Sequence, residues 1–239
     1  MDRSDQRINE NALLERMHSL IDRWNARGDK REVFLHCYSL MTANMQAGIE
    51  KGAFLDGEWV SRLIITFAEY YFTALEQWER EPSSAPRVWQ IAHEYTRQKE
   101  SAVLQHLLLG INAHINYDLM LTVDEVLKAD WDEMTDEQRE DRYEDYCRVN
   151  AILTETIDAV QDEIIAPAMP MGALVDTLLG RFDEMLISRV ITTWRDKTWY
   201  SAVWLLGAPD QDARSAVIAK VEEDAMTLAG HLSSGMKLK

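Results

Sequence analysis

The sequence predicts an all-α protein, and two of its features carry that prediction. Apolar residues recur at intervals of three and four along nearly the whole chain of 239 residues, whereas the strict alternation of a β-strand is nearly absent. Ten glycines and five prolines are few for this length, which favours long helices over short strands joined by tight turns. We therefore expect a single helical domain over residues 1–239, built as a bundle of about seven to nine helices.

The expected helices are separated by turn signals at glycine, proline and charged residues. Gly28-Asp29 ends the first helix, and Asp56 stands where it would cap the third. Thr135 to Gln138 resembles a helix start. The expected helices cover approximately these ranges: 9–26, 30–49, 57–75, 89–95, 100–120, 146–160, 173–206 and 209–232.

Charge and composition narrow the class of protein. The chain has 25 basic and 41 acidic residues, a net charge of −16, and a pI of about 4.8. Such a surface repels phosphate backbones and anionic lipid, so we expect no nucleic-acid partner and no membrane partner. No apolar run reaches the ~18 residues of a membrane span, and the charged first residues lack the apolar core of a signal peptide. The two distant cysteines, Cys37 and Cys147, suit a reducing compartment, and together these features predict a cytoplasmic protein.

The most informative segment is residues 104–121, LQHLLLGINAHINYDLML, which is strongly apolar yet carries several polar residues. A polar group inside an apolar helix costs free energy unless it has a partner. At about 100° per residue, the polar residues of an ideal helix form two stripes. One stripe holds His106, His114, Tyr117 and Asp118, and the other holds Gln105, Asn112 and Asn116. We therefore expect a buried central helix whose polar stripes face neighbouring helices, with at least one stripe facing a cavity.

His114 and Asp118 are separated by one helical turn, so their side chains can touch. Three roles remain open for this pair. The carboxylate could orient an acid–base imidazole, both groups could bind a metal ion, or the pair could be a hydrogen bond that holds helices in register. His106 could not share that metal ion, because it lies about 18 Å from Asp118 along a helix axis. The further ligands would come from other segments, such as His36, Glu69 or Asp158.

Arg195 and Trp199 lie one turn apart on a later helix. The planar guanidinium of an arginine suits a carboxylate or a phosphate, and a tryptophan suits an apolar part of a ligand. The same residues also suit a structural role, in which Arg195 pairs with Asp118 or Asp158 and Trp199 packs in the core.

The segment QHLLLGINAHINYDL, Gln105 to Leu119, resembles the hallmark LLGxNAHINxDL of a family of bacterial helical proteins. That family is catalogued as a domain of unknown function. Two further segments are similar to its patterns FxD…FAxxY and RxxxWxxAxxL. The first segment comprises Phe54-Leu55-Asp56 with Phe67-Ala68 and Tyr71. The second comprises Arg195, Trp199, Ala202 and Leu205. The resemblance spans roughly residues 24–206, and it implies signature positions at Asn112, His114, Asn116 and Asp118. His106 also matches many members, Tyr117 occupies a more variable position, and the resemblance implies no activity.

The main functional hypothesis is a small-molecule enzyme with a pocket against the central helix. In it His114 is the general acid or base, and Asp118 orients it. The catalytic candidates are His114, Asp118, His106 and Tyr117, and the substrate-binding candidates are Asn112, Asn116, Arg195 and Trp199.

The sequence leaves three other readings open. One is a non-catalytic protein that binds a small molecule or a partner, and another is a metal-dependent hydrolase or oxygenase. In the third, both polar stripes are structural hydrogen-bond networks. The sequence names no substrate, no cofactor and no oligomeric state.

Overall fold

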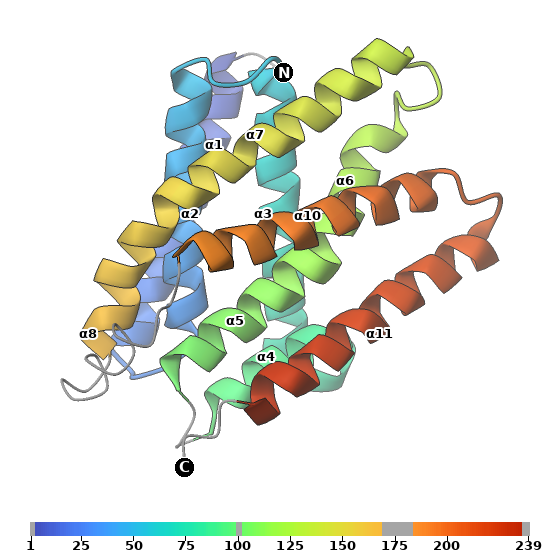
Figure 1. The fold of residues 1–239 in the computed structure, drawn as a ribbon. Helices are drawn as coiled ribbons and strands as arrows, with labels where there is room; N and C mark the ends of the chain where they lie inside the picture. The colour runs from blue at the N-terminus through green and yellow to red at the C-terminus, as the bar shows by residue number, and fades with distance from the viewer. Residues whose placement is uncertain (1–2, 99–101, 169–183, 236–239) are drawn as a thin grey trace. The chain divides into compact units, whose positions relative to one another are not determined.

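The computed structural model of the chain describes residues 3–98, 102–168 and 184–235, and these contain helices and turns but no strand (Figure 1). The helices in chain order are α1 (Arg3–Asn25), α2 (Glu32–Glu50), α3 (Gly57–Arg80), η1 (Pro82–Ser84), α4 (Arg87–Thr96), α5 (Val103–Ala113), η2 (His114–Asp118), α6 (Leu119–Lys128), α7 (Asp136–Val160), η3 (Gln161–Ile165), α8 (Ala166–Ala168), α10 (Glu184–Leu206) and α11 (Gln211–Gly235). The all-α prediction is confirmed. With directly consecutive helices counted as one, the described ranges form 8 helices besides the short 3₁₀ turn η1.

Several predicted boundaries are close to the observed ones. Gly28 and Gly52 have φ angles of 63° and 72°, a left-handed conformation that follows α1 and α2 and that glycine adopts without steric cost. The expected helix over 173–206 is observed from Glu184 onward, and its first residues lie outside the described ranges. The same holds for the expected start of the central helix at Glu100.

The chain divides into two compact units, of which the first comprises residues 1–61 and 136–193. In this unit α2 packs between α1 and α7 (Figure 1). The fully buried Asp145 accepts hydrogen bonds from the backbone N–H groups of Leu55 and Asp56, each at 2.7 Å. Asp56 in turn accepts a hydrogen bond from the backbone N–H of Trp59 at 2.9 Å, so it caps α3 as predicted. A buried carboxylate on α7 therefore fixes the loop that starts α3.

The second unit comprises residues 62–135 and 194–239. Within it α5 packs against α4 and α11, and α11 also contacts α4 and η2 (Figure 1). The central helix runs without a break through α5, η2 and α6, and most of its apolar side chains are buried. The unit boundary falls inside α3 and inside α10, so each unit contains residues from both halves of the chain. The single domain expected from the sequence stays a prediction.

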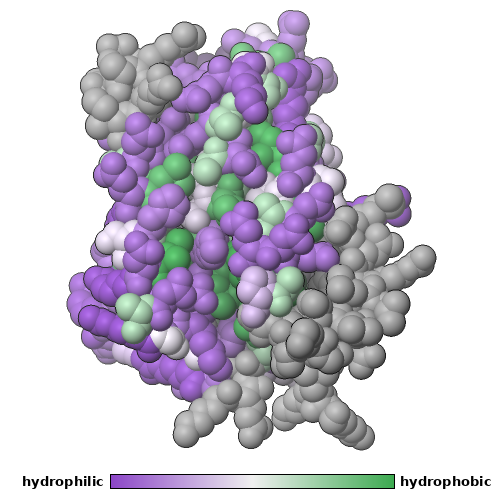
Figure 2. Space-filling view, turned by 90° about the vertical axis from the view of Figure 1, so that its left-hand side faces the viewer, coloured by the Kyte–Doolittle hydropathy of each residue, from purple (hydrophilic) through white to green (hydrophobic). Residues whose placement is uncertain are grey.

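The outer surface is mainly polar on the face shown in Figure 2, where apolar residues form small groups separated by hydrophilic ones. This agrees with the charge of the chain, in which 28% of the residues are charged.

Candidate functional site

The central helix changes its hydrogen-bonding pattern at the most informative segment of the sequence. Residues His114–Asp118 form a turn of π-helix, η2, in which the N–H of Leu119 bonds to the carbonyl of His114, five residues back. The directions expected from the sequence assume an ideal α-helix, and the central helix departs from that geometry over these five residues. A π turn holds one more residue than an α turn, so the positions after His114 depart from the directions of an ideal α-helix.

The π turn is supported by a side chain from α10. At the end of a π turn the spacing of the backbone hydrogen bonds changes from five residues to four. One carbonyl of the turn then accepts no hydrogen bond from a backbone N–H. The hydroxyl oxygen of Thr198 lies 3.0 Å from the carbonyl oxygen of Ile115 and 2.9 Å from that of Trp194, and it donates its proton to them. Thr198 is buried, so this donor compensates a carbonyl inside the protein.

His114 and Asp118 form the contact that their spacing predicts. Nδ1 of His114 lies 2.9 Å from Oδ2 of Asp118, and the two residues are 2% and 1% exposed. The indole N–H of Trp89, on α4, donates to the same oxygen at 2.9 Å. An ionised carboxylate only accepts hydrogen bonds, so beside an ionised Asp118 the proton of the His114 ring is on Nδ1.

Burial controls the protonation of both groups. It lowers the pKa of His114 well below its usual value, so the imidazole is neutral at pH 7. It raises the pKa of Asp118 well above its usual value, and the hydrogen bond from Trp89 opposes that increase. When Asp118 is ionised, the neutral imidazole donates from Nδ1 and has its basic nitrogen at Nε2, which is the arrangement of an acid–base pair.

Aromatic rings enclose the His114 imidazole. It stacks on Phe67 with ring centroids 3.5 Å apart and planes 5° apart, and the Tyr71 ring approaches edge-on at 6.0 Å. The Trp89 ring lies 6.1 Å away. Phe67 and Tyr71 belong to the segment that resembles the FAxxY pattern, so two of the three resembling segments meet at this imidazole.

Of the other two catalytic candidates, His106 lies away from this pair, whereas Tyr117 directly precedes Asp118 in η2. His106 is buried eight residues before His114, about 12 Å along a helix axis, and its ring is 6.1 Å from that of Tyr95. Tyr117 is half-buried, and its burial, then Glu222 of α11 and then Asp118, raise its pKa to about 12. The structure thus joins His114 to Asp118 by a hydrogen bond, places His106 elsewhere, and relates Tyr117 to Asp118 by charge.

The amide stripe connects the central helix to α11. Nδ2 of Asn112, which is fully buried, donates to the carbonyl of Ala225 at 2.9 Å. Nδ2 of Asn116 donates to Oδ1 of Asn112 at 3.0 Å. Gln105, at the other end of the stripe, accepts a hydrogen bond from the N–H of Ala102 at 3.2 Å and so supports the start of α5.

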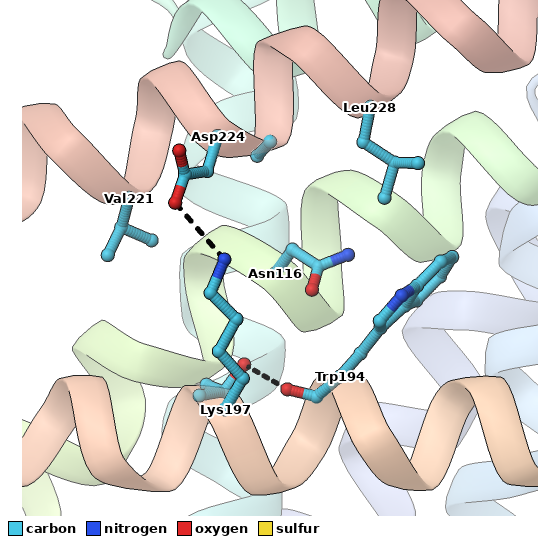
Figure 3. A pocket seen from close by; sticks show the side chains of 8 residues that line it. Asn116, Trp194, Lys197, Val221, Asp224 and Leu228 are labelled. Atoms are coloured by element: carbon cyan, nitrogen blue, oxygen red, sulfur yellow. Dashed lines mark hydrogen bonds and ion pairs between the residues drawn. The ribbon is translucent and has the colours of Figure 1, made fainter.

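A pocket of about 150 Å³ opens beside this stripe, where η2 faces α10 and α11 (Figure 3). It is lined by Asn116, Trp194, Lys197, Thr198, Val221, Asp224, Ala225 and Leu228. Nζ of Lys197 lies 3.1 Å from Oδ2 of Asp224 and reaches across the pocket (Figure 3). Hydrogen bonds, chiefly from Lys220 and then from Lys197, lower the pKa of Asp224 below its usual value.

Of the four predicted binding residues, Asn116 lines this pocket, and Asn112 orients the amide of Asn116. Arg195 and Trp199 are each 4% exposed and are not among its lining residues. Their neighbours Trp194 and Lys197 line it instead. Lys197 and Asp224, which also line the pocket, are not predicted from the sequence. They lie on different helices, and no local pattern indicates that α10 and α11 bring them together.

Two further structural features that bear on the class of protein are a metal site and a membrane-spanning helix. Over the described residues, no group of three or more histidine, cysteine, aspartate or glutamate side chains is arranged to hold a metal ion. Within the same ranges, none of the helices combines the length and the apolar character needed to cross a membrane.

Comparison with known proteins identifies the family. A family model described as a family of unknown function (DUF5995) matches residues 11–235. The chain therefore belongs to this family, and the expected membership of a helical family of unknown function is confirmed. No curated protein and no solved structure matches the chain.

Proposed function

We propose that this protein binds a small molecule in the pocket between η2, α10 and α11. The observation that carries the proposal is the position of the pocket, which lies against the one turn of the central helix that departs from α-helical bonding. A π turn is less favourable than α-helix and is found frequently at functional sites. The pocket combines an amide, a carboxylate and an aromatic ring with apolar walls, which is the usual composition of a ligand site.

In this proposal the polar residues of η2 are positioning residues. The bonds from Trp89 and His114 to Asp118 fix one side of the turn, and Thr198 and Asn112 fix the other. Asn116 is thereby held at the pocket by its hydrogen bond to Asn112. The same proposal includes a cytoplasmic location, which the two distant cysteines support, and no nucleic-acid partner, which the net charge of −16 supports.

The experiment is a screen of small metabolites by ligand-observed NMR, repeated on two tryptophan variants of α11. Val221→Trp fills the pocket, whereas Val217→Trp places the same side chain one turn earlier, at a residue outside the pocket lining. We expect compounds that bind the wild type and Val217→Trp but not Val221→Trp. The proposal is wrong if no compound binds, or if every compound that binds does so equally well to both variants.

Acid–base catalysis by His114 and Asp118 is the second candidate, and the hydrogen bond of 2.9 Å between them favours it. A neutral imidazole oriented by a carboxylate is the arrangement that general-base catalysis uses. The limiting observation is access, because His114 is 2% exposed and does not line the pocket. A reaction at Nε2 would therefore require Phe67 or Tyr71 to move.

The catalytic candidate is tested on any compound that the screen identifies. The compound is incubated with the wild type and with His114→Asn, whose amide keeps a donor near the position of Nδ1. Turnover by the wild type that His114→Asn loses, while it still binds the compound, would support catalysis. Unchanged turnover in His114→Asn would exclude His114 as the catalytic base.

A further inference from the structure

The hydrogen bonds of the amide stripe determine which atom Asn116 presents to the pocket. The carbonyl of Ala225 only accepts hydrogen bonds, so Asn112 must turn its Nδ2 toward it, as observed at 2.9 Å. Oδ1 of Asn112 then faces Asn116, which must turn its own Nδ2 to that oxygen, at 3.0 Å. One backbone carbonyl thus orients two amides in series. The oxygen of Asn116 remains as an acceptor on the side of α10 (Figure 3).

The charged groups of the pocket are also arranged for a positive ligand. Asp224 lies on the lining, and its side chain is 37% exposed. Lys220, one turn earlier on α11, donates to Oδ1 of this carboxylate at 2.5 Å, and the ammonium of Lys197 lies 3.1 Å from Oδ2. The Lys197 side chain is 63% exposed, so its ion pair contributes little stability. Lys197 therefore shows that an ammonium fits between α10 and α11, and it is held weakly enough to be replaced.

The rest of the lining suits the carbon part of such a ligand. Trp194 stands at one side of the pocket, and Val221 and Leu228 project from α11 (Figure 3). An aromatic face attracts a cation, and apolar walls accommodate a short alkyl chain. The net charge of −16 attracts cations to the protein as a whole.

From these observations we infer that the ligand of this pocket is a small primary amine, bound as its ammonium ion. Its N–H groups donate to Oδ1 of Asn116 and to the carboxylate of Asp224, and it displaces the ammonium of Lys197. Its alkyl chain lies between Trp194 and the apolar side chains of α11. This inference rests on the proposed function, because it assigns a ligand class to the same pocket.

Three probes of matched size separate the ligand classes: n-butylammonium, n-butanol and n-butyrate. We expect ligand-observed NMR to detect n-butylammonium on the wild-type protein, with the other two at least about tenfold weaker. Asp224→Asn should weaken n-butylammonium by about tenfold, whereas Glu223→Gln, an exposed neighbour outside the lining, should leave it unchanged.

Lys197→Met supplies the sharpest test, because it removes the lysine ammonium that the ligand would displace but keeps an unbranched side chain, while Lys220 keeps its bond to Oδ1 of Asp224. We expect it to strengthen n-butylammonium binding by several-fold. Lys128→Met makes the same change in net charge at an exposed residue of α6 and should have no such effect. Weaker binding of n-butylammonium to Lys197→Met would overturn the inference.

The possible failures are distinguishable. If n-butyrate or n-butanol binds better than n-butylammonium and loses its site in Val221→Trp, the ligand class is wrong and the proposed binding function stands. If no probe and no screened metabolite shows binding that Val221→Trp abolishes, both the ligand class and the proposed function are wrong.

Discussion

Asp118 is buried, and the free-energy cost of burying its carboxylate depends on the hydrogen bonds that it accepts. Its Oδ2 receives the indole N–H of Trp89 and lies 2.9 Å from Nδ1 of His114, while its backbone carbonyl accepts the hydroxyl of Thr122 at 2.9 Å. A carboxylate in an apolar interior is costly unless such donors surround it. The Trp89 side chain therefore matters as a hydrogen-bond donor as well as for its packing.

The first prediction concerns this donor. Trp89→Phe keeps an aromatic ring but removes the N–H, so Asp118 loses one of its hydrogen bonds. We expect the free energy of unfolding in urea to fall by about 1–3 kcal/mol more than in Trp78→Phe. Trp78 is also buried and also packs against His93, so it matches the loss of ring volume. Equal losses in the two variants would show that the Trp89 N–H contributes nothing.

The second prediction concerns pH. Burial lowers the pKa of His114 in the folded protein, so the unfolded chain binds a proton at this residue more readily than the folded protein does. Stability from the neutral imidazole is present above the unfolded-state pKa of about 6.5 and is lost as the pH falls below it, by at most about 1.4 kcal/mol per pH unit. We expect His114→Asn to lose part of this slope in urea unfolding measured between pH 7.5 and pH 5, a range that spans about one unit either side of that pKa.

The control is His231→Asn, which makes the same replacement at an exposed residue, and His114→Asn should change the slope by more than this control does. Asp118 contributes with the opposite sign, since its raised pKa in the folded protein makes stability increase as the pH falls through that pKa. Asp118 is present in the wild type, in His114→Asn and in His231→Asn. A difference between their pH slopes of the free energy of unfolding therefore tests His114. Identical slopes in the wild type and in His114→Asn would contradict the prediction.

At the scale of one element, η2 depends on a neighbouring helix for its stability. Thr198→Val keeps the shape of the side chain but removes the hydroxyl that donates to Ile115, which leaves a buried carbonyl without that donor. We expect a loss of about 1–3 kcal/mol in the free energy of unfolding and faster hydrogen exchange of the amides in the turn. Thr227→Val, at an exposed position of α11, should change the free energy of unfolding by less than about 0.5 kcal/mol. A similar loss in both variants would mean that the Thr198 hydroxyl does not support the turn.

The same element shows how far the sequence could predict the site. Spacing along one helix was enough for the contact between His114 and Asp118, because residues four apart meet whether the turn is α or π. The π turn itself could not be predicted from a period of 3.6 residues. Trp89 and Phe67 could not be predicted as partners of this pair, since they come from other helices and no local pattern records the contact.

For the binding candidates, too, a pattern within one helix can be predicted from the sequence, whereas contacts between helices cannot. Asn112 and Asn116 are predicted because an amide is unusual in an apolar helix, and Asn116 lies at the pocket. Arg195 and Trp199 are predicted from their chemistry, but both are buried, and Trp194 and Lys197 of α10 line the pocket instead. Which face of α10 meets α11 is decided by packing in three dimensions, beyond what the 3.6-residue period specifies.

At the scale of the whole molecule, the dominant property is a net charge of −16 at pH 7. Mutual repulsion of the excess carboxylates opposes the compact state, whereas the exposed ion pairs favour it by about 0–1 kcal/mol each. Added salt screens both effects. Because each exposed ion pair contributes little and the acidic residues exceed the basic ones by 16, the loss of repulsion should dominate.

The last prediction follows from this balance. Raising NaCl from about 0.01 M to about 1 M shortens the screening length from about 30 Å to about 3 Å. At pH 7 we expect the midpoint of thermal unfolding to rise with salt, since the net repulsion is removed. Near pH 4.8, the pI of the chain, the net charge vanishes, and the same addition should leave the midpoint unchanged or lower it by screening the remaining ion pairs. A fall at pH 7, or an equal rise at both pH values, would mean that net charge does not limit the stability of this fold.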